Sequence, residues 1–353
     1  MSSVNLQSRE GLIQEFLCAH GHGSSVRTHL TGDASSRAYE YVQAGQADPV
    51  ILMNAPQQPD GPPIRDGKPY SQIARLAEDI RAFVGVAMML EEHGFRVPKI
   101  HAQELDHGLL LIEDLGNTGI ITDQRQPIDE RYVAAIETLK AVHEKQWPDA
   151  VQLQDGSQYS LANFDQDAMM IEVDLLAQWY APYKLGRSLA DQELAELQTI
   201  WRNMIGTLQS AEHSIVLRDY HSPNIIWMAG CSGTDRTGLI DFQDALRGPS
   251  AYDVASLAQD ARVDVSAELE TLLLDHYCKL RTGFDEEQFR AAYAVLAAQR
   301  ATKILGIFVR LWQRDGKDAY LAHLPRIESY LQRSLKHPVL REYKAWAAAV
   351  LNI

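Results

Sequence analysis

The chain has few cysteines and no excess of basic charge, and both shortages exclude classes of protein. Its three cysteines, Cys18, Cys231 and Cys278, lie far apart and form no CxxC pair. This spacing favours neither a disulfide framework nor a zinc site. Acidic side chains number 47 against 33 basic ones, which gives a formal net charge of −14. Nucleic acids and anionic membrane surfaces both attract basic faces, so we expect neither as a partner.

Long apolar runs are also absent, since no stretch approaches the roughly 20 residues that a membrane span requires. The start of the chain, MSSVNLQSREGLIQEF, has no basic segment followed by an apolar core, so we do not expect a signal peptide. The protein is therefore predicted to be soluble and cytoplasmic, and we expect it to be a monomer.

What is present is a globular composition, 46% hydrophobic and 23% charged, over a length of 353 residues that suggests two lobes. The first third alternates β-formers with turn residues, and then shows apolar residues at helical spacing. We expect strands at 26–32, 37–44 and 50–53, a surface loop at 57–69, one helix at 72–94, and strands at 99–104 and 109–113.

Beyond residue 115 the pattern is mainly helical, with long helices expected at 129–146, 164–180 and 191–212 and again after residue 249. Three short β-rich runs interrupt them, at 215–218, 225–228 and 239–241. The layout predicts an α+β protein with a small N-terminal lobe of antiparallel sheet plus helix (1–113). A connector at 113–116 then leads to a larger, mainly helical C-terminal lobe (117–353).

The most informative segments are LRDYHSPN (217–224) and IDFQD (240–244). An aspartate, an asparagine five residues later and a second aspartate at a strand end are the groups that phosphoryl transfer needs. A loop between two strands lets Asp219 point at a substrate while Asn224 turns toward a metal, and Asp241 completes the metal site. Because these ligands are all oxygen atoms, they suit magnesium better than zinc or copper.

At these residues the chain resembles the aminoglycoside phosphotransferase and choline kinase-like family, whose members are relatives of protein kinases. The family pattern HxDxxxxN appears with Leu217 in place of the histidine. The resemblance implies a bilobal protein-kinase-like fold, with ATP and Mg²⁺ as cofactors. It further implies Asp219 as catalytic base, Asn224 and Asp241 as magnesium ligands, and Asp253 as a structural acid that supports the catalytic loop.

Within that family the chain is most similar to the sugar kinases that phosphorylate the anomeric hydroxyl of N-acetylmuramate and N-acetylglucosamine in bacterial cell-wall recycling. The similarity lies in GDASSR, VILMNAP, IDFQDALRGPSAYDVASLAQDARVDV and KILGIFVRLWQRDGKDAYL. It implies an ATP-dependent sugar kinase. Two alternatives stay open: a kinase for another small hydroxyl compound (choline, homoserine, a methylthio-sugar or an aminoglycoside), and a non-catalytic ATP-binding module.

The nucleotide side departs from the kinase pattern. No lysine occurs from Ser2 through Arg65, and Met53 stands near the position of the usual phosphate-binding lysine. Its usual glutamate partner is missing too, because Phe83 and Val84 occupy that part of the helix. We expect the turn at 32–37 to meet the phosphates instead, through Gly32, Ser35, Ser36 and Arg37. The alternative is an ordinary hairpin turn with a surface arginine.

The resemblance also assigns the connector LLLIEDLG a role, since its backbone near Glu113 and Leu115 would bind the edge of adenine. The alternative is a solvated linker.

Polar residues set in apolar helices are candidates for binding the acceptor sugar. Acidic groups can bind hydroxyls, and arginine can bind a carboxylate. The candidates are Asp260, Arg262, Glu172 and Arg310. Each has the alternative of a solvated helix face or an internal ion pair.

Overall fold

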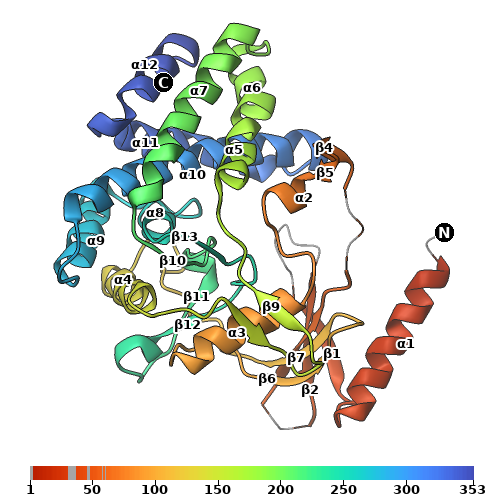
Figure 1. Ribbon diagram of the computed structural model, residues 1–353. Coiled ribbons are helices and arrows are strands. Elements are labelled where there is room, and N and C mark those ends of the chain that lie inside the picture. Colours follow the sequence, from red (N-terminus) through yellow and green to blue (C-terminus); the bar gives the residue numbers. More distant parts are fainter. Residues whose placement is uncertain (1–2, 31–36, 46–47, 58, 60) are drawn as a thin grey trace.

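The computed structural model describes residues 3–30, 37–45, 48–57, 59 and 61–353, the side chains of 3–8 excepted (Figure 1). An antiparallel sheet lies at one end of the molecule and a mainly helical assembly at the other. The predicted α+β, kinase-like architecture is confirmed in this arrangement.

The sheet has five strands in the order β1-β2-β3-β7-β6, all pairs antiparallel. Its strands are β1 (Val26–Leu30), β2 (Ala38–Gln43), β3 (Val50–Asn54), β6 (Ile100–Glu104) and β7 (Leu109–Glu113). Because neighbouring side chains on a strand point to opposite faces, β3 and β7 each contribute to two apolar clusters. Leu52 and Leu111 join the cluster on one face, whereas Met53 and Leu110 join the main core on the other.

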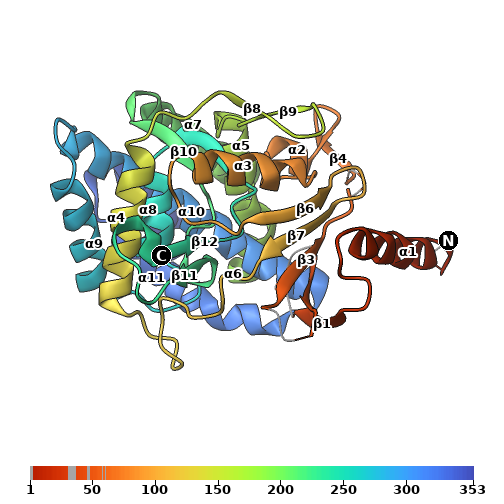
Figure 2. The ribbon, with the colours of Figure 1, turned by 90° about the horizontal axis from the view of Figure 1, so that it is seen from below.

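A helix covers each face of this sheet (Figure 2). The N-terminal helix α1 (Ser3–Ala19), which the sequence analysis did not predict, packs Ile13, Phe16 and Leu17 against the first face. Helix α3 (Arg81–Glu92) packs on the second face and joins the main core.

The segment between β3 and α3 corrects two expectations. The expected loop at 57–69 contains a hairpin of β4 (Pro63–Arg65) and β5 (Lys68–Pro69). The expected helix at 72–94 is broken into α2 (Tyr70–Ile73) and α3, with Arg75 in the left-handed region at φ +56°. The break is held from outside, because Arg218 donates to the Ala74 carbonyl (3.0 Å) and Asp244 accepts from the Ala77 amide (2.6 Å). Tertiary contacts here override an amphipathic pattern.

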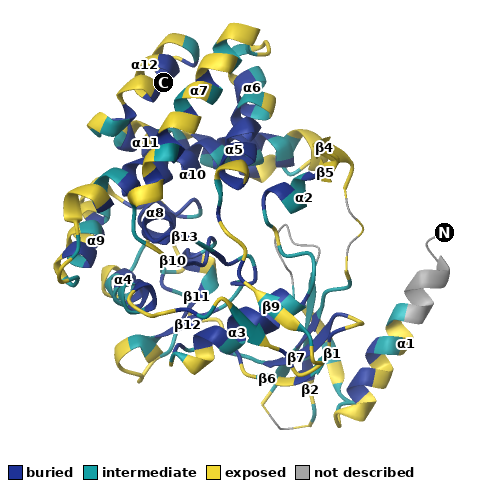
Figure 3. Cartoon of the chain, viewed as in Figure 1, coloured by how far each residue is buried: buried dark blue, intermediate teal, exposed yellow. Residues whose placement is uncertain are grey.

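The helical assembly surrounds one long apolar helix, α10 (Glu286–Asp315), which contacts α5, α8 and α11. The other elements are α4 (Asp129–His143), α5 (Gln166–Leu175), a π-helical turn (Leu176–Tyr180), α6 (Ala181–Leu185), α7 (Asp191–Thr207), α8 (Ala251–Ala258), α9 (Ala267–Lys279), α11 (Leu324–Ser334) and α12 (Arg341–Val350). In the part of the chain that the structure describes, α10 is the single helix long and apolar enough to cross a membrane. However, 89% of its apolar window is buried inside the structure, as the dark ribbon of α10 in Figure 3 shows. This burial is that of a core helix in a soluble protein.

Two small antiparallel pairs lie between the sheet and the helices. Strand β10 (His213–Val216) pairs with β13 (Leu246–Pro249), and β11 (Ile225–Trp227) pairs with β12 (Thr237–Leu239). Strand β11 matches the predicted run at 225–228, β10 overlaps the run at 215–218, and β12 overlaps the run at 239–241 at Leu239 alone, whereas β13 was not predicted.

Segments that precede the predicted connector in the chain pack against segments that follow it. Helix α2 contacts α5, and the hairpin of β8 (Ala150–Gln152) and β9 (Gln158–Ser160) contacts α3. Gly85 permits the second contact, since a Cβ atom there would lie 2.2 Å from the Tyr159 ring. The lobe boundary at 113–116 stays a prediction.

Candidate active site

The catalytic loop runs from the end of β10 to the start of β11, and two buried aspartates hold it. Asp253, which is fully buried, accepts hydrogen bonds from the amides of Leu217 (2.6 Å) and Arg218 (2.9 Å). Asp260, also fully buried, accepts from the amide of Ser222 (2.7 Å). These bonds fix the backbone on both sides of Asp219.

Arg218 adopts a left-handed conformation, with φ +65°. This conformation costs about 1–2 kcal/mol in a residue other than glycine. It is retained because every part of the residue is bound: its amide by Asp253, its carbonyl by the Ser256 hydroxyl (3.2 Å), and its guanidinium by Glu172 and the Ala74 carbonyl. Strain held by this many contacts is typical of a functional site.

The three predicted oxygen-bearing residues lie together at one end of a cleft. Asn224 donates from Nδ2 to the carbonyl of Asp219 (2.9 Å), and the same nitrogen lies 3.5 Å from Oδ2 of Asp241. Asp241 follows β12 in a left-handed conformation, φ +57°, which brings its carboxylate next to the loop. Arg37 donates to Asp241 (3.3 Å) and lies 3.8 Å from a carboxylate oxygen of Asp244.

The two aspartates of this cluster have pKa values shifted in opposite directions. Burial on its own raises the pKa of Asp219, but the charges of His221, Lys303, Arg218 and Arg300 outweigh it and hold that pKa below its usual value. Burial and the negative charge of Asp219 raise the pKa of Asp241. The lowered pKa favours an ionised carboxylate at Asp219, and the raised pKa of Asp241 favours a cation beside that residue.

The donor set fits magnesium. Since the Asn224 nitrogen is used within the loop, its amide oxygen is the ligand that remains, beside the Asp241 carboxylate. Among the described residues, no group of three or more His, Cys, Asp or Glu side chains is placed to hold a metal ion. A cation at Asn224 and Asp241 would therefore depend on phosphate oxygens for the rest of its coordination, as magnesium does in phosphoryl-transfer sites.

A buried charge network lies beneath the catalytic loop. Glu172, which is fully buried, pairs with Arg218 and with Lys303 (2.7 Å), and accepts a hydrogen bond from Gln299 (2.9 Å). Glu172 does not line the cleft, and its carboxylate is surrounded by internal partners, so its predicted contact with the acceptor stays a prediction. The alternative of an internal ion pair is what the structure shows.

The cleft has a volume of about 680 Å³ and lies between the sheet and the catalytic loop. Its walls near the connector are apolar on both sides, with Ile51 and Ile112 from the sheet facing Ile226 and Ile240 from the loop region. Glu113 and Leu115 both line it, as does Arg37. The amide of Glu113 is used by the Lys99 carbonyl (2.8 Å), and its carboxylate is bound by Arg96 (2.9 Å), which lowers its pKa. Of the predicted phosphate turn, Gly32, Ser35 and Ser36 lie outside the described residues.

Of the four predicted acceptor residues, all of which the structure describes, Arg262 is the one that lines the cleft. Its guanidinium lies 5.7 Å from the centre of the Tyr320 ring. The carboxylate of Asp260 is buried and accepts from the amides of Ser222 and Arg262 (2.8 Å), and its predicted contact with the acceptor stays a prediction. Arg310 lies 5.3 Å from the ring centre of Tyr70, on the α2 side of α10 and not on the cleft wall.

The position of the usual lysine–glutamate pair is apolar. Met53 is 1% exposed and belongs to the main core together with Phe83 and Phe242. The rings of Phe83 and Phe242 stack with centroids 4.9 Å apart. Because Phe242 follows Asp241 directly, α3 and the metal-ligand segment are joined here by apolar packing and not by an ion pair.

The cleft is also lined by polar residues that were not predicted as site residues, among them Tyr39, His221 and Asp244. His221 and Asp244 lie inside the two catalytic segments, so their proximity to Asp219 and Asp241 was a usable signal. Tyr39 had no such signal, because its place depends on strand register. Burial and the nearby Asp241 raise the pKa of Tyr39 to about 12.

The fold and the cleft are those of a kinase-like phosphotransferase, and comparisons with known proteins agree. The model of the phosphotransferase enzyme family matches residues 27–301. The chain is 36% identical to an N-acetylmuramate/N-acetylglucosamine kinase of Caulobacter vibrioides, over 96% of this chain and 95% of that protein. It is 31% identical to a protein of the same name from Pseudomonas aeruginosa, over 94% and 92%.

Solved structures show the same fold at low identity. The choline kinase LicA of Streptococcus pneumoniae superposes with a TM-score of 0.56 at 13% identity, covering 92% of this chain and 99% of that one. ADP-bound aminoglycoside phosphotransferase APH(2'')-Ib superposes with a TM-score of 0.52 at 16% identity, covering 88% and 94%. This chain belongs to the phosphotransferase enzyme family.

Proposed function

We propose that this chain transfers the γ-phosphoryl group of ATP to the anomeric hydroxyl of N-acetylmuramate and N-acetylglucosamine. The observation that carries the proposal is the cluster of Asp219, Asn224 and Asp241 at the inner end of the cleft. The acceptor comes from the relatives named above, which are 36% and 31% identical over nearly the whole chain.

In this proposal Asp219 accepts the proton of the anomeric hydroxyl. The hydroxyl oxygen forms a bond to the γ-phosphorus, the bond from that phosphorus to the bridging oxygen breaks, and ADP leaves with the electron pair. Asp219 is suited to this because the cations around it lower its pKa and keep it ionised at neutral pH. Its position is set by the bonds of Asp253 to the preceding amides.

Magnesium on Asn224 and Asp241 would supply neutralisation of the charge on the phosphates. The raised pKa of Asp241 supports this assignment, since burial and the negative charge of Asp219 outweigh the effect of the nearby Arg37. Arg37 is proposed as a cation for the phosphates, because it already lies between Asp241 and Asp244.

Adenine would lie between the isoleucines of the cleft, against the backbone at Glu113 to Leu115. Apolar walls on both faces of a planar base, with polar backbone at its edge, are the usual way to bind it. We also propose that the protein acts as a cytoplasmic monomer with two lobes that meet at 113–116.

A panel of acceptors tests the function. The purified protein is incubated with ATP, magnesium and, in turn, N-acetylmuramate, N-acetylglucosamine, choline, homoserine, a methylthio-sugar and an aminoglycoside, and ADP release is measured by a coupled assay. We expect kcat/KM for the two amino sugars to exceed the others by at least about 10³-fold, the scale on which a site built around a substrate's polar groups discriminates. Turnover of choline at the higher rate would refute the acceptor, and no turnover of any acceptor would refute catalysis.

A further inference from the structure

Gln243 is a buried polar residue that the proposed mechanism does not use. It lies in the IDFQD segment, two residues after Asp241, and is 3% exposed. Its side-chain nitrogen Nε2 donates a hydrogen bond to Oδ1 of Asp241 (2.9 Å) and lies 3.5 Å from Oδ2 of Asp244. Because ionised carboxylates only accept hydrogen bonds, the nitrogen of the amide, and not its oxygen, must face the two aspartates. The orientation of the side chain is therefore set by its partners.

The hydrogen bond from Gln243 makes the two carboxylate oxygens of Asp241 unequal. Oδ1 receives hydrogen bonds from Gln243 and from Arg37 (3.3 Å). Oδ2 lies on the side of Asn224, 3.5 Å from Nδ2 of that residue. Carboxylates that bind metal ions are commonly held by hydrogen bonds of this kind, which fix their orientation. Oδ2 is thus the oxygen that remains for a cation beside Asn224.

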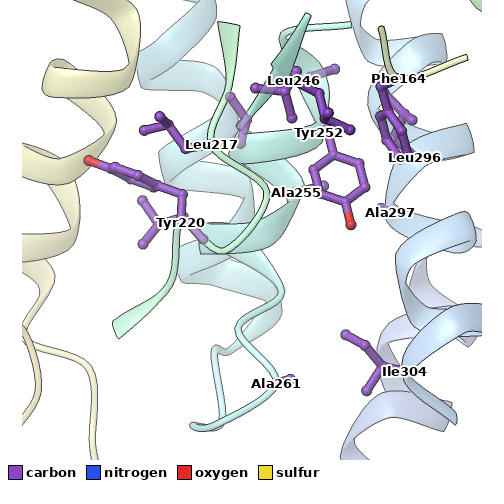
Figure 4. Close-up of a cluster of buried hydrophobic side chains, with 14 of the residues drawn as sticks. Phe164, Leu217, Tyr220, Leu246, Tyr252, Ala255, Ala261, Leu296, Ala297 and Ile304 are labelled. Atoms are coloured by element: carbon purple, nitrogen blue, oxygen red, sulfur yellow. The ribbon is translucent and has the colours of Figure 1, made fainter. Parts of the chain in front are cut away.

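Both chain neighbours of Gln243 are anchored. The ring of Phe242 packs in the main core, which Figure 4 shows in part, and stacks on Phe83 with centroids 4.9 Å apart. The carboxylate of Asp244 accepts from the amide of Ala77 (2.6 Å). The other end of the Gln243 amide, Oε1, is buried and has no hydrogen-bond partner among the described residues. Gln243 lines a cavity of about 250 Å³, which has room for water beside this side chain. These contacts fix the position from which the amide reaches the carboxylate.

We propose that Gln243 is a positioning residue for the metal ion, because its amide holds Oδ1 of Asp241 and so turns Oδ2 toward the cation beside Asn224. The inference rests on the magnesium of the proposed function and deepens it, since Gln243 itself touches neither the cation nor the reacting atoms. A neutral donor suits this place, because a further acid next to Asp241 and Asp244 would repel both carboxylates. The alternative is that Gln243 binds the cation through Oε1, and the experiments separate the two.

Binding of Mn²⁺ tests the proposal without any need for turnover. The ion is titrated into the protein with ADP and, as a blank, into ADP alone, and free Mn²⁺ is measured by electron paramagnetic resonance. For Gln243→Met, which keeps the volume and removes the donor, we expect the Kd for Mn²⁺ to rise about 10- to 100-fold, the usual effect of losing a partner of a metal ligand.

The matched control for this titration is Gln259→Met. Gln259 is also 3% exposed, and its Nε2 donates to a carboxylate oxygen of Glu270 (2.8 Å), but it does not line the cleft. The Kd for Mn²⁺ should stay within about threefold in this variant. An unchanged Kd in Gln243→Met, or an equal rise in both variants, would overturn the positioning role.

Magnesium kinetics adds a readout that a merely structural role would not move. In Gln243→Met the magnesium concentration for half-maximal activity should rise about 10- to 100-fold, while kcat at saturating magnesium returns to within about threefold of the wild type. If kcat were lowered to the same extent at every magnesium concentration, the side chain would serve the fold and not the cation.

A last arm needs no variant. In a crystal structure of the wild-type protein with ADP and Mg²⁺, we expect the ion on Oδ2 of Asp241 and the Gln243 nitrogen still on Oδ1. An ion bound to Oε1 of Gln243, or to both oxygens of Asp241, would overturn the proposal even if Gln243→Met failed to fold. If the amino sugars are phosphorylated but Gln243→Met binds Mn²⁺ as the wild type does, the positioning role fails while the proposed function stands. If neither sugar is phosphorylated and Mn²⁺ binding still depends on Gln243, the proposed function alone fails.

Discussion

The sheet side and the loop side of the cleft differ in how much charge they bury. On the sheet side, where a kinase-type site has a lysine–glutamate pair, Met53 and Phe83 are packed in the core and Phe83 stacks on Phe242. On the loop side, a buried network of Arg218, Glu172 and Lys303 lies under Asp219. Buried charge is thus concentrated beneath the base, and the link from α3 to the metal-ligand segment is apolar.

In a kinase-type site, the lysine–glutamate pair both positions the helix and supplies a cation to the phosphates. The difference between the two sides shows that these two tasks can be separated. Positioning of α3 needs only complementary packing, which Phe83 and Phe242 provide. In the proposed mechanism, cations near the reacting groups come instead from Arg37, beside the proposed metal ligand Asp241, and from the network below Asp219.

We expect the largest effect from removing the negative charge of Asp219, which lies above the buried network of the loop side. Asp219→Asn should lower kcat by at least about 10³-fold, because it removes the carboxylate proposed to accept the proton, while KM for ATP changes little. Steady-state kinetics with either amino sugar measures both constants. The control is Asp235→Asn, an exposed aspartate outside the cleft. Substantial activity in Asp219→Asn would show that the network supports something other than a base.

Breaking the network itself should cost stability. Glu172→Ala leaves Arg218 and Lys303 buried without their carboxylate, and removal of one partner from a buried pair typically costs about 3–5 kcal/mol. Urea unfolding followed by circular dichroism gives the free energy of unfolding. Glu287→Ala, at an exposed position on α10, should cost less than about 1 kcal/mol. If the two variants lost the same amount, the network would not be the source of rigidity under the loop.

Introducing charge on the sheet side should also be unfavourable. Met53→Lys places a lone cation among apolar residues and should lower the free energy of unfolding by about 2–4 kcal/mol, whereas Met53→Leu should cost less than about 1.5 kcal/mol. Thermal and urea unfolding of the two variants compare them directly. A stable Met53→Lys protein with a lower KM for ATP would mean that the apolar position is not essential to the packing of α3.

We expect a smaller effect from removing Arg37, the arginine that lies beside Asp241. Arg37→Ala should raise KM for ATP by roughly tenfold, the effect of losing one charged hydrogen bond to phosphate. Arg27→Ala is the matched control, because Arg27 pairs with Glu10 and Glu40 and does not line the cleft. An unchanged KM for ATP in Arg37→Ala would assign the phosphates to other groups.

The smallest effect is a pH dependence that separates the two aspartates. The pKa of Asp241 is raised and that of Asp219 is lowered, so Asp241 takes up a proton first as the pH falls. Activity at low magnesium should therefore decline on the acid side before activity at saturating magnesium does. Magnesium titrations between about pH 7.5 and pH 5, a range that spans carboxyl shifts upward from about 3.9, measure this. Acid loss that is independent of magnesium would contradict it.

Local patterns predicted the parts of the molecule that local chemistry determines. The strands β2, β3 and β7 and the catalytic loop follow from alternation, turn residues and one motif, so their places were correct. The break between α2 and α3 was missed, because it is imposed by Arg218 and Asp244, far away in the chain. The internal partners of Glu172 and Asp260 were not identified for the same reason: nothing in a single sequence tells a buried partner from a ligand contact.

The most direct test of the account is the position of the transferred phosphate. The protein is incubated with ATP, magnesium and N-acetylglucosamine, beside a parallel sample of Asp219→Asn, and the product is examined by ³¹P and ¹H NMR. The account predicts a phosphate coupled to the proton on the anomeric carbon, and no such product from Asp219→Asn over the same time. A phosphate on any other hydroxyl, or the anomeric phosphate formed equally by both proteins, would contradict it.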